Sequence, residues 1–386
     1  MSTRIWLIVA PHRNDEEQVA PNEKDAARIL LEVLHVGAVS LSRFPTGLAH
    51  YVYDVVTENG QSVVVRLARP DRKAYFRGAL TWYEPLTRLG VPLPFLRYHE
   101  LDEAVHGFPV MIMDRLLGTD LGDAYPALTH EQKRGIADHI VEIQRAVSRM
   151  PEGPGFGYAQ TENDSGLHGT WKEVLDANLD RSHHRFARTG VLPPEIADRV
   201  SGLVQDNAPY LATVRPTCFL DDTTTKNVLV HHGSLSGIVD VDNVAYGDLL
   251  YNLALTRMAL LSAGMDTIYT EYWATRLSLS PEQSQAVSLY TAVFCVDFLS
   301  ETGYRFNQDQ PEPNDAERVK KLIALLDILC DEVTDHPTPT DVQESTAAHL
   351  EALLREGLES GEPIPGTEDY IRQKRAEAVK RIESTA

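Results

Sequence analysis

The order of strand-forming and helix-forming segments is the feature that most constrains how this chain can fold. Several early segments read as strands because apolar residues alternate or cluster in them, namely residues 49–57, 61–69, 91–100 and 107–121. Asn59-Gly60 lies between the first two and is a typical two-residue hairpin turn. A helical pattern separates the second and third strands, and helical spacing dominates from about Gly118. We therefore expect a small sheet with one helix, extending to about Met113, followed by a larger helical part.

The composition restricts the cellular setting and the partners. The 386 residues are 43% apolar and 24% charged, as in an ordinary globular protein, and the formal net charge is −20. Nucleic acid is not an expected ligand, because phosphate backbones require clustered Lys and Arg side chains. No apolar run approaches the roughly 18 residues of a membrane span. The 3 cysteines form neither a disulfide framework nor a zinc pattern, so we expect a reduced, cytoplasmic protein with no membrane partner.

The most informative segment is CFLDDTTTKNVLVHHGSLSGIVDVDN, residues 218–243. We interpret it as two strands joined by a turn at Gly233-Ser234, a register that places Asn227 opposite Asp240, with Cβ atoms about 4.5–5.5 Å apart. An amide oxygen and a carboxylate at that separation can share Mg²⁺, which completes its shell with phosphate oxygens and water. Asp222 precedes the first strand, and its loop can bring a proton-accepting carboxylate beside the metal. Phosphoryl transfer from a nucleotide needs such a set of one base and two metal ligands.

Simpler roles for these residues stay open. Asp, Asn and Thr are common in turns and at helix caps, so the segment DDTTTKN by itself is explained equally well as an ordinary loop. Asp240 by itself is explained as the residue that ends a strand. The occurrence of Asp222, Asn227 and Asp240 together on one hairpin edge favours a functional role over these simpler ones. A metal-dependent hydrolase is the weakest interpretation, because the sequence lacks the usual histidine-rich ligand cluster and His231-His232 lie at the far end of the hairpin.

The chain resembles the aminoglycoside phosphotransferase family and, more broadly, choline kinases and protein kinases. The family's His-Gly-Asp triplet, the Asn five residues after its Asp, and the Asp of its IDW segment match Leu220-Asp221-Asp222, Asn227 and Asp240. The segments GVPLP, FPVMIMDRLLGTDL, GFGYAQ and YGDLLYNLA match further family segments in the same order, so the resemblance covers residues 28–335. It implies an α+β, bilobal protein-kinase-like fold, with a small β-rich N-lobe and a large, mainly helical C-lobe.

The resemblance also implies roles for individual residues. Asp222 is then the catalytic base, and Asn227 and Asp240 are the Mg²⁺ ligands. Arg66 takes the place of the family's phosphate-binding lysine, and Glu84 is its expected partner on the following helix. The other implied nucleotide-binding positions are Gly47 in the loop over the phosphates, Met113, Asp114 and Leu116 in the hinge, and Lys226 beside Asn227.

Two positions depart from the family pattern, and several roles have simpler alternatives. Leu220 replaces the histidine that braces the metal-binding aspartate, and Arg66 replaces the lysine while still offering bidentate phosphate donors. A solvated strand cation for Arg66, a surface glutamate for Glu84, a plain hairpin around Gly47 and a solvent-exposed Lys226 are the alternatives.

The implied activity is ATP- and Mg²⁺-dependent transfer of the γ-phosphate to a hydroxyl of a small molecule. The expected partners are therefore a nucleotide and a small hydroxylated acceptor, and the fold does not name that acceptor. Asp297 and Glu301 share one helical face, where they either bind an amine-bearing acceptor or form a solvated surface. Asp242 either lies behind the metal site or forms a turn with Asn243.

We expect four segments: an N-terminal extension at 1–27, the N-lobe at 28–114, the C-lobe at 115–335, and a linker with a charged helical tail at 336–386. The tail is similar to the C-terminal arm of ParD-type antitoxins, which wraps a partner toxin, but it lacks their DNA-binding half. This similarity supports an alternative function, a kinase-like binding scaffold with weak or no catalysis whose tail recruits a protein partner. A helix pair without a partner is the simpler interpretation of the tail.

Overall fold

The computed structural model describes residues 20–44, 50–161, 164, 166–304 and 315–334. The expectations for Gly47 and for the tail at 336–386 lie outside the described residues. The strands are β1 (Ala38–Arg43), β2 (Tyr51–Thr57), β3 (Ser62–Leu67), β4 (Leu96–Glu100), β5 (Val110–Asp114), β6 (Thr119–Asp120), β7 (Gly157–Ala159), β8 (Thr217–Phe219), β9 (Val228–His231), β10 (Ser234–Ile238) and β11 (Val244–Gly247). The α-helices are α1 (Glu23–Leu34), α2 (Lys73–Arg88), α3 (Glu103–His106), α4 (Leu121–Ala124), α5 (His130–Val147), α6 (Trp171–Thr189), α7 (Glu195–Asp206), α8 (Ala208–Leu211), α9 (Leu250–Ser262), α10 (Ile268–Leu277), α11 (Pro281–Ser300) and α12 (Ala316–Thr334), and η1 (Pro70–Arg72) and η2 (Tyr125–Ala127) are short 3₁₀ helices.

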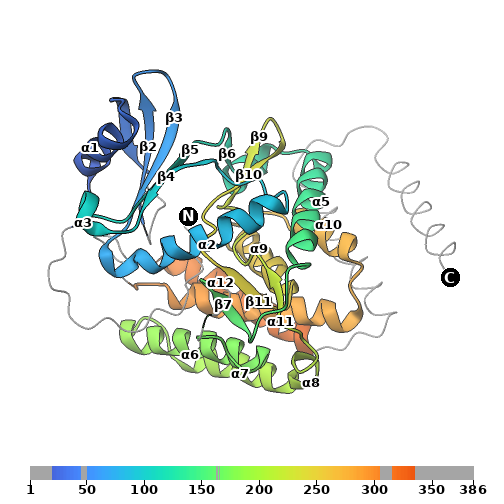
Figure 1. The fold of residues 1–386 in the computed structure, drawn as a ribbon. Helices are drawn as coiled ribbons and strands as arrows, with labels where there is room; N and C mark the ends of the chain where they lie inside the picture. Colours follow the sequence, from blue (N-terminus) through green and yellow to red (C-terminus); the bar gives the residue numbers. More distant parts are fainter. Residues whose placement is uncertain (1–19, 45–49, 162–163, 165, 305–314, 335–386) are drawn as a thin grey trace. The chain divides into compact units, whose positions relative to one another are not determined.

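The first five strands form one antiparallel sheet in the order β1-β2-β3-β5-β4 (Figure 1). Gly60 has a φ of 79° in the turn between β2 and β3, which explains the Asn-Gly pair in the sequence. Side chains alternate along β3, so Val63 and Val65 are buried on one face while Arg66 points to the other. This alternation presents the arginine to the side of the sheet that faces the hairpin of β9 and β10.

Helix α1 covers the apolar face of the sheet. Ala26, Ile29 and Leu30 recur at helical spacing, and all three are fully buried in the same cluster as Val63 and Val65. The helix begins at Glu23, so the boundary expected at residues 27 and 28 falls within it. The expectation of one helix beside the sheet is wrong, because α1 and the short α3 accompany α2.

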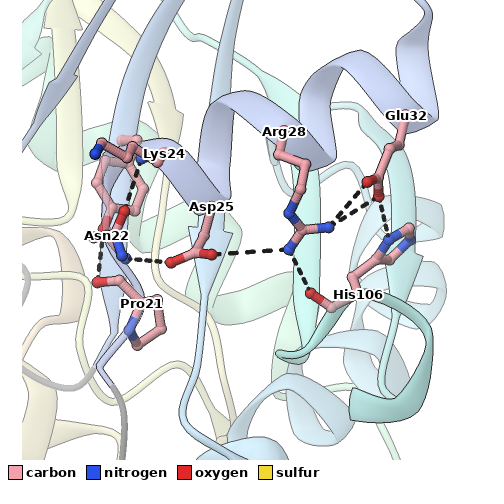
Figure 2. Close-up of polar contacts among 8 residues, drawn as sticks. Pro21, Asn22, Lys24, Asp25, Arg28, Glu32 and His106 are labelled. Carbon is pink, nitrogen blue, oxygen red and sulfur yellow. Dashed lines mark hydrogen bonds and ion pairs between the residues drawn. The ribbon is translucent and has the colours of Figure 1, made fainter.

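Polar contacts attach α1 to the short helix α3, which lies between β4 and β5, as Figure 2 shows. Arg28 donates a hydrogen bond to the carbonyl of His106 at 2.8 Å, and the same guanidinium contacts Glu32 one turn later. The Glu32 carboxylate also lies 3.1 Å from Nδ1 of His106. The Arg28 and Glu32 side chains are partly exposed, so the buried apolar stripe of α1 contributes most of the docking free energy.

Helix α2 connects the sheet to the helical part of the chain. A Cβ atom at Gly78 would lie 2.0 Å from the carbonyl oxygen of Asp242, so only glycine permits this close approach. Four residues later, the indole N–H of Trp82 donates to the carbonyl of Ala159 at 2.8 Å. These contacts fix α2 on the segment that follows β10 and on the end of β7.

The helical part is built around α11, which is buried on all sides from Ala286 onward. Its residues from Ala286 to Ser300 are all buried, and it packs against α6, α9 and α12. Two small sheets, β10-β9-β6 and β7-β11-β8, complete this part and carry the segment at 218–243. Within the described ranges, every helix is too short or too polar to cross a membrane.

Two adjacent leucines of α1 provide a direct test of its packing. Leu30→Ala should lower the free energy of unfolding by about 2–4 kcal/mol, because Leu30 is fully buried against the sheet. Leu31→Ala is the matched control, since Leu31 is 55% exposed, and it should change the same quantity by less than about 0.5 kcal/mol. Denaturant titrations measure both, and equal effects would contradict the docking of α1 through its buried face.

Candidate functional site

The hairpin of β9 and β10 turns one residue earlier than the sequence suggests. His232 and Gly233 occupy the turn with φ values of 50° and 76°, the left-handed pair that tight hairpin turns favour. A bulge between Leu235 and Gly237 then shifts the later pairs by one residue. Turn chemistry and the bulge together set the register.

The expected pairing of Asn227 with Asp240 is therefore wrong. The N–H of Val239 donates to the carbonyl of Asn227 at 2.9 Å, so Asn227 lies opposite Val239. Asp240 lies beyond the end of β10 and has a φ of 61°. This backbone conformation is uncommon for residues other than glycine and has a conformational cost, which is typical of functional turns. The Asp240 carboxylate reaches Arg66 on β3 from this turn.

Asp222 lies in the loop before β9, and its carboxylate is held within that loop. Its Oδ1 accepts a hydrogen bond from the hydroxyl of Thr224 at 2.9 Å. Its carbonyl accepts one from the side-chain amide of Asn227 at 3.1 Å. Burial, followed by the negative charges of Asp221 and Asp240, raises the pKa of Asp222 well above its usual value. A carboxylate in this environment is a stronger proton acceptor than one in water.

The loop is braced although Leu220 replaces the family's histidine. Gln144 on α5 accepts from the N–H of Leu220 at 3.0 Å and donates to its carbonyl at 2.7 Å. Asn252 on α9 donates to the carbonyl of Asp221 and accepts from the hydroxyl of Thr223 at 2.8 Å. All of these side-chain contacts are buried, where hydrogen bonds constrain the backbone strongly. Buried amide side chains therefore hold this loop at the position where the resemblance implies a histidine.

Arg66 lies between two carboxylates of the segment after β10. Its Nη2 donates to Oδ1 of Asp240 at 2.7 Å and to both oxygens of Asp242 at 3.0 Å. The guanidinium also lies over the ring of Phe76, with its Cζ 5.3 Å from the centroid. Arg66 is 6% exposed, so it is not a solvated strand cation.

His50 completes this group from the start of β2. Its Nε2 lies 2.7 Å from Oδ2 of Asp242, and the imidazole is almost fully buried. Burial of Asp242 acts to raise the pKa of its carboxyl, but the charge of Arg66 and the contacts with His50 outweigh it and keep this pKa below the usual value. Asp242 is thus ionised at neutral pH, and it is part of the site rather than of a simple turn.

The expected ion pair between Arg66 and Glu84 is wrong. Glu84 is 71% exposed on α2 and contacts Arg88 one turn later on the same helix. Where α2 lines the crevice, it presents Ala79 and Tyr83. The carboxylate partner of Arg66 is therefore supplied by the segment after β10 and not by the helix.

The expected hinge borders a small apolar cavity beside Arg66. The cavity has a volume of about 40 Å³, and its lining residues are Arg66, Ala79, Tyr83, Leu86, Leu93, Pro94, Leu96, Met111, Met113, Ile238, Val239, Asp240 and Val241. The N–H groups of Asp114 and Arg115 already donate to the carbonyls of Phe95 and Ser62, so they are not available to adenine. Leu116 contacts the hairpin at Gly237 instead of lining the cavity. A nucleotide base needs a larger space, so this crevice has to open to admit one.

Two further groups of residues lie apart from the acids. Lys226 is half-buried, and its charge acts on Asp120 at the end of β6. A larger cavity, of about 300 Å³, is lined by Val191, Leu192, Ala316, Val319, Lys320 and Ile323. It has no carboxylate among these residues and so lacks groups for a metal or a proton acceptor.

The pair Asp297 and Glu301 is buried, so a solvated surface is excluded. Oδ1 of Asp297 accepts hydrogen bonds from Arg181 at 3.2 Å and from Arg185 at 2.9 Å. Burial acts to raise the pKa of Asp297, but the two arginines hold it below its usual value. Because this carboxylate is already neutralised by arginine, it is a poor site for a ligand amine.

The residues expected to bind Mg²⁺ offer suitable oxygen atoms. The amide nitrogen of Asn227 donates to the loop, which leaves its Oδ1 as an acceptor. Asp240 is about half exposed, and one of its oxygens contacts Arg66. Hard oxygen ligands with room for water and phosphate fit a magnesium ion. Ligand atoms of His50, Asp240 and Asp242 also lie within 4.8 Å of one another.

Sequence reasoning missed several residues of this site. His50 had no signal, because a single histidine before a strand is uninformative on its own. Gln144 and Asn252 lie on helices distant in sequence, and only packing brings them to the loop. Asp242 was noticed, but its contact with Arg66 depends on the approach of β3 to the segment after β10.

Comparisons with known proteins identify the family and the fold of the chain. The sequence pattern of the phosphotransferase enzyme family matches residues 40–282. No curated protein matches the chain by sequence. Among solved structures, a thermostable mutant of aminoglycoside phosphotransferase APH(4)-Ia in complex with ADP and hygromycin B has a TM-score of 0.58 at 15% identity, covering 81% of this chain and 99% of its own. A putative fructosamine-3-kinase from Thermobifida fusca has a TM-score of 0.53 at 16% identity, covering 80% and 97%. The expected bilobal protein-kinase-like fold is confirmed.

The buried carboxyl of Asp221 predicts a pH-dependent stability. Burial raises its pKa to about 7, above the value of about 3.9 in an unfolded chain. Between these values the native state holds a proton that the unfolded state has lost, so Asp221 reduces stability increasingly as the pH rises and reaches its full cost above about pH 7. Asp221→Asn removes the titrating group.

We therefore expect Asp221→Asn to stabilise the protein more at alkaline than at acid pH. The gain in unfolding free energy over the wild type should be about 2 kcal/mol larger at about pH 8 than at about pH 5. Thermal or denaturant unfolding at both pH values measures this difference. A gain that does not depend on pH would contradict the assignment.

Proposed function

Because the chain belongs to the phosphotransferase enzyme family, we propose that it transfers the γ-phosphate of ATP to a hydroxyl group of a small molecule. The observation that carries this proposal is the convergence of Arg66 with the acids of the segment after β10, next to the loop that holds Asp222. Asp222 experiences the charge of Asp240, so the proposed base and the proposed metal ligand lie close together. Small-molecule kinases need this combination of a proton acceptor, cationic phosphate donors and oxygen ligands.

Asp222 is the proposed base. Its raised pKa and its fixed position allow the carboxylate to accept the proton of an acceptor hydroxyl as the oxygen attacks phosphorus. The hydrogen bond from Thr224 holds one carboxylate oxygen in the loop, which leaves the other for the substrate. Gln144 and Asn252 keep the loop from moving as the proton is transferred.

Asn227 and Asp240 are the proposed ligands of Mg²⁺, which would neutralise charge on the phosphates when bound. Arg66 would orient the same phosphates through planar, charge-assisted hydrogen bonds. Met113 and its neighbours in the apolar cavity would contact the base of the nucleotide. Lys226 precedes Asn227 and is a secondary candidate for phosphate binding.

The alternative of a binding scaffold without catalysis has lost part of its support. Leu220 is braced by Gln144, and Arg66 faces the acids instead of solvent. Its remaining support, the tail at 336–386, lies outside the described residues. A phosphotransferase is therefore the function that the described residues favour.

The proposed role of Asp222 predicts a loss of turnover without a loss of binding. Once an acceptor has been found in a screen of hydroxylated antibiotics and metabolites, Asp222→Asn should lower kcat by about 100-fold or more, because the proton acceptor is removed. Its affinity for ADP should stay within about twofold of the wild type. Asp198→Asn, on the exposed surface of α7, is the matched control and should retain full turnover. If no acceptor supports the consumption of ATP and neither ATP nor ADP binds, the proposed function is wrong.

The proposed role of Asp240 predicts a loss of metal-dependent stabilisation. Ligands that bind the native state raise its melting temperature. For the wild type, ATP with Mg²⁺ should raise this temperature more than ATP alone, whereas Asp240→Asn should abolish the difference. A thermal-shift titration of both proteins with and without Mg²⁺ measures it. An unchanged difference in the variant would exclude Asp240 as a ligand.

A further inference from the structure

We propose that Asp242 and His50 position Arg66 for phosphate binding, in the place of a glutamate on α2. This inference rests on the proposed function and adds two positioning residues to the same site. It follows from the contacts of Arg66, from the burial of His50 and from the packing of α2.

The contacts of Arg66 separate an anchoring carboxylate from a metal-binding one. Nη2 donates its hydrogen bonds to Asp240 and Asp242, and among the described residues this nitrogen alone is engaged, which leaves Nε and Nη1 for a phosphate. Asp240 is half exposed and is a proposed metal ligand, whereas Asp242 is buried. A metal on Asp240 would compete with the guanidinium for the same oxygen. Asp242 can hold Arg66 while Asp240 binds the metal, because it contacts the arginine through both of its oxygens.

His50 fixes the orientation of that anchor. It donates from Nε2 to Oδ2 of Asp242, since an ionised carboxylate only accepts. The imidazole is 3% exposed and packs against Phe76, with ring centroids 4.8 Å apart. Nδ1 of His50 is buried and has no hydrogen-bond partner among the described residues. Burial of an imidazole with one unsatisfied nitrogen costs free energy, which favours a role for the contact that it does make.

The packing of α2 explains why the acid comes from elsewhere. Any side chain at Gly78 would collide with the carbonyl of Asp242, so the helix lies directly on the segment that holds this acid. The Arg66 guanidinium contacts the ring of Phe76 on the same helix. Glu84 is exposed and forms an ion pair with Arg88. With the helix seated in this way, Asp242 is the buried carboxylate that reaches Arg66.

A positioning role and a passive role for Asp242 predict opposite changes in the affinity for ADP when Asp242 is removed. If Asp242 were only a negative charge near the phosphates, removing it would reduce repulsion and tighten the binding of ADP. If it positions Arg66, removing it frees the guanidinium to stay on Asp240 and weakens the binding of ADP. Adenosine, which has no phosphate, reports the base pocket and the integrity of the fold in both cases.

The experiment measures the affinities of full-length variants for ADP and adenosine by calorimetry, without Mg²⁺. Asp242→Asn should weaken ADP binding about tenfold, the effect of losing one well-oriented charge-assisted contact, and should leave adenosine within about twofold. Arg66→Gln should weaken ADP binding similarly, and the double variant should be no weaker than Arg66→Gln alone, because both act through one guanidinium. Glu84→Gln is the matched control on α2 and should change neither affinity.

Substitutions of His50 test the same contact if Asp242→Asn fails to fold. His50→Gln keeps an N–H donor for Asp242, whereas His50→Phe keeps a ring without a donor. ADP binding should therefore be weakened several-fold more by His50→Phe than by His50→Gln, with adenosine unchanged in both.

Several outcomes would overturn this inference. They are unchanged or tighter ADP binding by Asp242→Asn, an equal loss of adenosine binding, and weakened ADP binding by Glu84→Gln. Equal ADP affinities of the two His50 variants would remove His50 from the proposal. If the wild type itself binds neither ADP nor ATP, with or without Mg²⁺, the proposed function fails as well, so the two failures are distinguishable.

Discussion

The ion pairs of Arg66 with Asp240 and Asp242 join the sheet to the helical part at the centre of the proposed site. They bring a buried cation from β3 to two acids of one turn, of which Asp242 is buried and Asp240 is about half exposed. Ion pairs in such surroundings are strong only if every partner is well placed, and here His50, Phe76 and the left-handed turn at Asp240 constrain the partners.

The loop that holds Asp222, the proposed base, is braced by amide side chains at the position where the resemblance implies a histidine. The family's histidine is replaced by Leu220, which is buried in the core. Gln144 and Asn252 hold the backbone of Leu220 and Asp221, directly before Asp222, through buried hydrogen bonds. The carboxylate is thus oriented by amides from α5 and α9, and its raised pKa results from burial among other acids. The backbone groups of Leu220 and Asp221 thus have hydrogen-bond partners without an imidazole.

A comparable replacement occurs at the carboxylate partner of Arg66. The helix position expected to supply it, Glu84, is on the outer surface of α2, and the acid comes from Asp242 instead. Gly78 makes this possible, because a side chain there would push the helix away from the Asp242 carbonyl. The close packing of α2 against the segment after β10 and the contact of Asp242 with Arg66 therefore result from the same packing arrangement.

Local sequence patterns were sufficient to predict a small sheet followed by a larger helical part, the strands around Asn59-Gly60, the face of β3 that carries Arg66, and the candidate acids around the hairpin. The kinase-like class of fold came from the resemblance to a family. Periodicity and turn residues act over a few positions, so they can be recognised without knowledge of the folded chain. The hairpin register could not be predicted in this way, because a bulge and the His232-Gly233 turn shift Asn227 away from Asp240. The partner of Arg66, the neutralisation of Asp297 by arginines and the brace at Leu220 also depend on residues far apart in the chain. Such contacts are established by tertiary packing alone, because the burial that gives them their strength does not exist before the chain is folded.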